Sequence, residues 1–168
     1  NRDRLLETLL LEAKSLTNAD GGTLYLLTDD DQLRFEIIRN DTLHIAMGGT
    51  TGQAITFPSV RLYDLETGEP NHKNVASYAA LAKEIVVIDD AYDAEGFDFS
   101  GTRAFDARTG YRSASFMTVP LMTTEREVVG VLQLINARDD DGTVIPFRAE
   151  VRSIIAALAS QAAIAIDN

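Results

Sequence analysis

The sequence predicts an α+β domain built around an antiparallel sheet. Apolar residues recur at helical spacing near both ends of the chain, and short stretches of alternating or β-branched apolar residues lie between them. Several of these stretches are separated by only a few turn-forming residues, which favours antiparallel pairing. The chain has 168 residues, of which 45% are hydrophobic and 24% charged, and this is typical of one globular domain.

The first helix is predicted over residues 3–16, because its leucines fall on one face at a period of 3.6 residues. Turn-forming residues 17–22 are expected to end this helix. Three extended segments follow at residues 23–28, 33–37 and 43–47, and the first two are expected to form a hairpin.

The pattern then breaks down over residues 48–73, where glycines and prolines recur without a regular period. The apolar patch at residues 60–63 predicts one short extended piece within a long loop. Loops of this length inside a compact domain are usually functional or mobile, so this segment is of interest for function.

Regular structure resumes after this loop, with apolar runs too short for long helices. Four elements are predicted in order: a helix at residues 77–83, a β-branched strand at 85–88, a short helix within 97–105, and a strand at 115–121 that Pro120 breaks.

The chain ends with a long strand and a helix. Residues 128–135 predict a central strand that forms a hairpin with the strand before it. The last helix is predicted from Phe147 onward, with one apolar face. Asp167 and Asn168 follow without a glycine or proline, so we expect the helix to continue in a larger multidomain protein from which this single domain, residues 1–168, is a piece.

Composition excludes several classes of protein. Fifteen basic residues against 26 acidic ones give a net charge of −11, which disfavours a nucleic-acid partner and an anionic membrane surface. The absence of cysteine excludes a disulfide framework, thiolate metal sites and a cysteine nucleophile. No apolar run approaches the ~18 residues of a membrane span, and we expect a cytoplasmic location.

The sequence contains no recognisable catalytic or metal motif. His44 and His72 lie in no motif, and we interpret both as ordinary surface or edge residues. The acidic run 139–142 fails the calcium-loop pattern, because Val144 stands where the sixth-position glycine would be. The glycines of residues 48–52 lack the spacing of a phosphate-binding loop.

One polar cluster does suggest a binding site. Hydroxyls, a carboxylate and a cation occur within eight residues just before a buried strand, at Asp106, Thr109, Tyr111, Arg112 and Ser113. Such groups above an apolar sheet suit a small-molecule pocket. The alternative interpretation is an irregular loop whose side chains satisfy their own backbone.

Several stretches together resemble the GAF domain, a sensory module of cyclic nucleotide phosphodiesterases, adenylate cyclases and bacterial HD-type phosphohydrolases. The stretches that carry the resemblance are residues 16–25, 88–92, 105–106, 109–113, 119–121 and 128–136. The resemblance spans nearly the whole chain. It implies a central antiparallel sheet of about six strands, with the first and last helices on one face and a ligand pocket on the other.

The resemblance also implies which residues line the pocket. Those on the matching positions are Asp106, Thr109, Ser113, Gln133 and Thr102, together with the backbone of Val75 and Ala76. A rival alignment places Thr50 and Thr51 where Val75 and Ala76 stand. The preferred alignment leaves residues 48–73 as a long loop insertion near the pocket, which is expected to act as a lid or to block the site.

Cyclic-nucleotide-binding members of the family carry an N-K-F-D-E signature, and this chain keeps only part of it. Asn136 and Phe147 match the Asn and Phe, whereas Ala137 replaces the Lys. Val151 and Arg152 replace the Asp and Glu, so the family's Lys–Asp ion pair is not available. Arg138 with Glu150 is one substitute pair that the sequence offers.

These features lead to three functional hypotheses. The preferred one is a regulatory domain that senses a small molecule, with a cyclic nucleotide (cAMP or cGMP) as one candidate, and controls an effector domain in the same chain. We also expect the terminal helices to form a homodimer. The alternatives are a ligand-free dimerisation spacer, and a hydrolase that uses Asp106 and His72. The family's bilin-binding and methionine sulfoxide reductase activities need cysteine, and its haem-binding members leave His44 or His72 as candidates.

Overall fold

The computed structural model describes residues 1–167 and contains one antiparallel sheet, whose strands differ in length. Six strands run in the order β3-β2-β1-β7-β6-β5, with β4 beside β2 and β8 beside β7. Their bounds are β1 Ala19–Leu27, β2 Gln32–Asn40, β3 Ile45–Gly48, β4 Val60–Arg61, β5 Val86–Ile88, β6 Phe116–Met122, β7 Val128–Arg138 and β8 Val144–Ile145. All of these pairings are antiparallel, which confirms the predicted α+β class.

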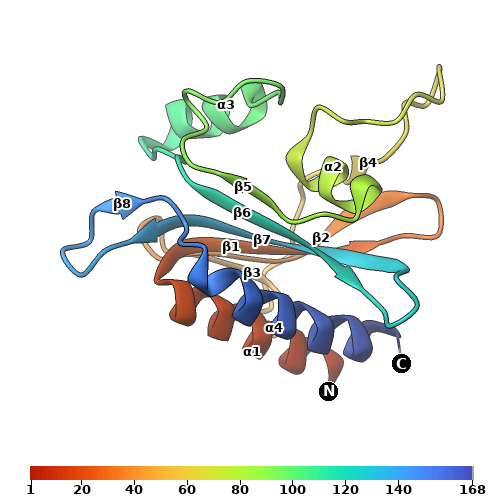
Figure 1. The fold of residues 1–168 in the computed structure, drawn as a ribbon, viewed down its shortest axis with the longest axis horizontal. Helices are drawn as coiled ribbons and strands as arrows, with labels where there is room; N and C mark the ends of the chain where they lie inside the picture. Colours follow the sequence, from red (N-terminus) through yellow and green to blue (C-terminus); the bar gives the residue numbers. More distant parts are fainter. Residues whose placement is uncertain (168) are drawn as a thin grey trace.

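The four helices of residues 1–167 cover both faces of this sheet. Helices α1 (Arg2–Thr17) and α4 (Glu150–Asp167) pack side by side on one face, as expected. Helices α2 (Val75–Ala82) and α3 (Ser100–Thr109) lie over the other face, apart from each other (Figure 1). The two ends of the described chain lie at the same end of the α1–α4 layer.

No helix within residues 1–167 is long and apolar enough to cross a membrane.

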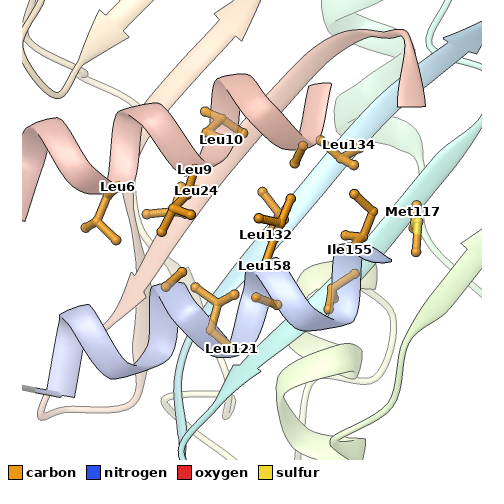
Figure 2. Packing of buried hydrophobic residues seen from close by; sticks show 14 of the residues in the cluster. Leu6, Leu9, Leu10, Leu24, Met117, Leu121, Leu132, Leu134, Ile155 and Leu158 are labelled. Carbon is orange, nitrogen blue, oxygen red and sulfur yellow. The ribbon is translucent and has the colours of Figure 1, made fainter. Parts of the chain in front are cut away.

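The largest core lies between the sheet and the two terminal helices. Figure 2 shows Leu6 and Leu10 of α1, Ile155 of α4, and Leu132 and Leu134 of β7 in the layer between the two helices and the sheet, and all five side chains are buried. Burying an apolar side chain of this size contributes about 1.5–3 kcal/mol. The leucine stripe of α1 therefore serves to attach the helix to the sheet.

Two smaller clusters cover the opposite face. Under α2, Ala76 and Ala80 pack against Tyr25 of β1 and Val131 of β7. Nearer α3, the loop residue Phe99 joins a second group whose other buried members are Val75, Ile88, Ala91 and Phe116. The part of the sheet between these clusters carries the candidate site.

The predicted turn at residues 17–22 is wrong, because β1 already begins at Ala19. Asn18 alone makes the reversal, with a left-handed φ of 52°, and caps the carbonyl end of α1. Gly22 lies inside the strand, where a Cβ would come within 2.8 Å of Leu10 Cδ1. This glycine therefore permits close packing of helix on strand and forms no turn.

Three further expectations need correction. β6 runs through Pro120 without a break, because β5 pairs only as far as Thr118 and leaves that edge without a partner strand. The acidic turn after β7 leads into the short strand β8. The last helix begins at Glu150, while Phe147 packs into the main core.

Candidate functional site

Helix α3 is attached to the body of the domain through Asp106, the one buried residue among its ten. The predicted short helix at 97–105 is displaced, since α3 runs to Thr109 and so includes Asp106. Asp106 Oδ1 accepts a hydrogen bond from Ser113 Oγ, and Oδ2 accepts one from the Ser113 backbone N–H, both at 2.8 Å. The Tyr92 hydroxyl also donates to Oδ2, and this bond raises the pKa of Tyr92. The predicted pair Asp106 and Ser113 is thus brought together, and its oxygens hold α3.

The segment that leaves α3 is held by Asn136 at the end of β7. Asn136 is buried and has a left-handed φ of 59°. Its Oδ1 accepts the N–H groups of Ala114 and Ser115, and its Nδ2 donates to the Arg112 carbonyl and the Tyr111 hydroxyl. All four bonding positions of the amide are used, so the asparagine of the family signature orders the exit from α3.

Asp20 on β1 forms the centre of a buried polar network. Its Oδ2 accepts from the Tyr111 hydroxyl at 2.6 Å, and its Oδ1 accepts from Arg138 Nη1 at 3.1 Å. Burial tends to raise the pKa of this carboxyl, but the hydrogen bonds from Tyr111 and Thr42 and the Arg138 charge outweigh burial and lower it. Arg138 also lies near Asp41, and within residues 1–167 it forms no ion pair with Glu150. The substitute pair expected from the sequence is therefore wrong.

A row of uncharged polar side chains crosses the sheet between α2 and α3. Thr23 of β1 and Thr118 of β6 both stand opposite Gln133 of β7, on the face that α2 covers. The Thr118 hydroxyl donates weakly to Gln133 Oε1 at 3.4 Å. Gln133 is half-buried, and within residues 1–167 its Nε2 has no protein partner yet is not sealed from solvent. Thr23 and Thr118 are buried, so Gln133 is the accessible member of this polar floor and carries its unused donor.

The other predicted residues lie on α2 and α3. Val75 and Ala76 form the buried first turn of α2, which the Asn74 side chain caps. Thr102 is half-buried on α3, one turn before Asp106 and on the same side of the helix. Thr109 is exposed; its hydroxyl donates to the Phe105 carbonyl and accepts from the Tyr111 N–H. Val75 and Ala76 thus belong to the helix that packs on β6 and β7, whereas Thr102 and Thr109 lie on α3.

Thr50 and Thr51, the residues of the rival alignment, are engaged elsewhere. Thr50 donates to the Glu7 carboxylate of α1 through both its N–H, at 2.8 Å, and its hydroxyl, at 2.7 Å. Burial raises the pKa of Glu7, but these bonds and the charge of Arg39 produce a net lowering. The Thr51 hydroxyl donates to the Gly48 carbonyl. This geometry favours Val75 and Ala76 as the residues beside the floor.

The histidines are not part of a reactive arrangement. His72 lies in the long loop with its ring 5.7 Å from that of Tyr78, whereas within residues 1–167 the Asp106 carboxylate is bonded to Tyr92 and Ser113. His44 is exposed in a turn with a φ of 54°. No group of three or more His, Asp or Glu side chains in the described part of the chain is placed to hold a metal ion.

Sequence reasoning did not find Thr23, Thr118 or Tyr92. The two threonines belong to the floor only because the strand register places them opposite Gln133. Tyr92 reaches Asp106 across fourteen residues of chain. Alternation along β1 and β6 was the one available signal, since every second residue faces α2.

Comparisons with known proteins bear on the family and the fold. The sequence model of the GAF domain matches residues 1–166. The chain is 25% identical over 134 residues to a cGMP-specific 3',5'-cyclic phosphodiesterase of Drosophila pseudoobscura pseudoobscura. The aligned region covers 80% of this chain and 11% of the relative. The same figures hold for the enzyme of that name from Drosophila melanogaster. The chain thus spans about a tenth of the curated relatives it matches.

Solved structures with the same fold come from several kinds of protein. A GAF domain/HD domain protein from Geobacter sulfurreducens superposes with a TM-score of 0.64 at 14% identity, covering 99% of this chain and 92% of that one. The GAF domain of an Acinetobacter phosphoenolpyruvate-protein phosphotransferase gives 0.61 at 17% identity, with coverage of 99% and 92%. At these identities the structures establish the fold alone. Since the family match extends over nearly the whole sequence, we conclude that the chain belongs to the GAF domain family.

Proposed function

We propose that this domain senses a small molecule bound on the sheet between α2 and α3, above Gln133. The observation that carries the proposal is the Gln133 amide, which offers a donor without a protein partner within residues 1–167 on an otherwise well-satisfied sheet. Half-buried apolar neighbours, Ile38 beside Thr23 and Val86 beside Thr118, extend the floor on both sides. A few polar groups on an apolar surface are typical of ligand sites.

The weak attachment of α3 supports this proposal. A ten-residue helix that buries only Asp106 gains little from packing, so its opening costs little free energy. Ligand groups that reach Thr102 or Thr109 would bind better to one position of α3 than to another. Such a difference in affinity is what shifts a conformational equilibrium.

A cyclic nucleotide is the first ligand to test. The curated relatives are named as cGMP-specific phosphodiesterases, which suggests this chemistry without assigning it to this chain. Two arginines on α3, Arg103 and Arg108, provide local positive charge in a chain of net charge −11, whereas Arg112 nearby is paired with Asp90. Gln133 would pair with the base edge, and the first turn of α2, at Val75 and Ala76, would supply backbone groups.

The output would pass through the terminal helices to an effector domain of the same protein. The domain is a regulatory module and not itself an enzyme. Residues 153–166 of α4 contain no charged side chain, although Ile154 and Ile164 are 47% and 53% exposed. An uncharged, partly apolar helix face in solvent is typical of an interface, so we propose a homodimer through α4 and α1.

A thermal-shift screen against cyclic GMP, cyclic AMP and common metabolites tests the sensing function. A ligand at about 100 times its dissociation constant adds about 2.7 kcal/mol and raises the melting temperature by several degrees. Gln133→Leu should remove most of that shift, whereas the exposed control Gln53→Leu should keep it. A shift that survives Gln133→Leu would place the ligand elsewhere.

A ligand-free dimerisation spacer is the second candidate. The specific observation in its favour is that Asp106 and Ser113, two predicted ligand residues, satisfy each other. Ala137 in place of the signature lysine also favours a domain that binds no cyclic nucleotide. This function predicts no melting shift with any compound in the screen, together with a dimer that depends on Ile154 and Ile164.

A further inference from the structure

A continuous chain of side-chain contacts connects the exit of α3 with the end of α1. The Tyr111 hydroxyl donates to Asp20 Oδ2, and Arg138 Nη1 donates to Asp20 Oδ1. Arg138 Nε then donates to the Asn18 carbonyl at 3.1 Å, and its Nη2 lies 3.3 Å from Asn18 Oδ1. We call these four residues, Tyr111, Asp20, Arg138 and Asn18, the Tyr111 relay. Asn18 caps α1, so the relay ends on that helix.

The relay is most shielded from solvent at its centre, whereas Asn18 at its α1 end is exposed. The Asp20 side chain is only 4% exposed and that of Arg138 is 25% exposed. In such surroundings the hydrogen bonds of a charged network strengthen one another, and a group that loses its partner is costly. A branch through Asp41, which pairs with the buried Lys14 of α1 at 2.7 Å, joins the same arginine to the helix a second time.

The relay begins where α3 is fixed. Ser113, which bonds Asp106, is two residues from Tyr111, and Asn136 holds the segment between them through the Arg112 carbonyl. A displacement of Asp106 therefore pulls on the segment that places the Tyr111 hydroxyl. Opposite it, Asn18 and Arg138 form the junction of α1 with the sheet.

We infer that the Tyr111 relay couples the position of α3 to the last turn of α1, and so regulates the output of the site proposed above. This inference rests on the proposed function for its biological purpose. The coupling itself is a property of the protein without ligand, so it is tested without one. Tyr111 acts as a positioning residue, since it contacts Asp20 and Asn136 and needs no contact with the ligand.

Three Tyr→Phe substitutions test the coupling by amide hydrogen exchange. Tyr92→Phe removes one bond to Asp106 and loosens α3 while keeping the ring under Arg112. It should speed exchange in α3 and, through the relay, speed exchange in the last turn of α1 by about threefold or more, as expected for residues of one hydrogen-bonded network. In a Tyr111→Phe background the same substitution should still loosen α3 but leave α1 unchanged. The exposed control Tyr63→Phe should preserve the effect on α1.

An equal effect of Tyr92→Phe on α1 in both backgrounds would overturn the inference, and so would no effect on α1 when α3 is loosened. If Tyr111→Phe proves too unstable, Arg138→Gln breaks the contact between Arg138 and Asp20 instead. In that background Tyr92→Phe must likewise leave hydrogen exchange in α1 unchanged. A flat ligand screen with intact coupling would remove the sensing function and keep the relay. A ligand found in the screen, without coupling between α3 and α1, would keep the sensing function and remove the relay.

Discussion

Asp106 Oδ1 lies 2.8 Å from Ser113 Oγ, and this contact joins helix α3 to the segment that leads into β6. The same carboxylate accepts the Ser113 backbone N–H and the Tyr92 hydroxyl, so three donors depend on one side chain. A residue that resembles a ligand contact in the sequence thus holds the helix that borders the site.

Asp106→Ala should therefore destabilise the fold. The substitution leaves the buried Ser113 N–H and hydroxyl without their acceptor, which costs about 2–3 kcal/mol. Urea unfolding followed by circular dichroism measures this change. Asp93→Ala, at an exposed carboxylate nearby, is the control and should stay within about 0.5 kcal/mol of the wild type. Equal stabilities for the two variants would show that Asp106 does not hold α3.

Gly130 of β7 should not tolerate a side chain. A Cβ at this position would come within 2.3 Å of the Tyr25 carbonyl oxygen on the neighbouring strand, so Gly130→Ala must move the backbone. We expect a loss of about 1–3 kcal/mol or more in unfolding free energy. Gly101→Ala in α3, where a Cβ meets nothing within 4 Å, should instead stabilise by up to about 1 kcal/mol through helix propensity.

The acid sensitivity of the domain should depend on Asp20. The pKa of this carboxyl is lowered in the folded state, so its ionised form contributes stability above the pKa of an unfolded aspartate, about 3.9. That contribution is lost as the pH falls through the folded value. Asp20→Asn should lose about 2–3 kcal/mol at pH 7 and respond less steeply than the wild type between pH 5 and pH 3, approximately.

Chemical unfolding at a series of pH values measures this difference. Asp29→Asn, at an exposed aspartate on the β1–β2 turn, should retain the wild-type pH profile. Parallel profiles for Asp20→Asn and the wild type would contradict the role assigned to the buried network.

The proposed dimer gives a prediction for α4. Ile154→Glu and Ile164→Glu place charges on the uncharged exposed face and should convert a dimer into an 18.3 kDa monomer. The control is Val144→Glu on β8. Val144 is also an apolar side chain and is 40% exposed, but it lies outside α4, so this change should leave the dimer intact. Analytical ultracentrifugation over a range of concentrations distinguishes these results. A wild-type protein that is monomeric at every concentration would contradict the proposed homodimer.

The elements of this fold follow largely from local patterns. The leucines of α1 are a periodic signal that needs no tertiary knowledge. The alternation of Leu33, Phe35 and Ile37 predicted the strand β2 but not its faces, because a bulge in the pairing with β1 puts Ile37 in the core under α1 and α4, and Leu33 and Phe35 under α2. The errors lie where tertiary contacts decide. Gly22 looks like a turn residue but permits α1 to approach β1, and Pro120 continues a strand whose neighbour has already ended.

The candidate site was only partly predictable for the same reason. Gln133, Val75 and Ala76 came from the resemblance; Gln133 stands opposite Thr118 on the sheet, and Val75 and Ala76 form the first turn of α2. Thr118 enters through register, which a single sequence does not reveal. The role of Arg138 was missed because its partner Asp20 is 118 residues away along the chain.

The most direct test of the sensing function is the side-chain amide signal of Gln133 in a ¹⁵N–¹H spectrum during titration with cyclic GMP and then with each compound that raises the melting temperature. We predict that the Gln133 signal moves together with backbone signals of α3 and of the first turn of α2, at a single midpoint. A ligand that raises the melting temperature but leaves the Gln133 signal in place would contradict the site proposed here.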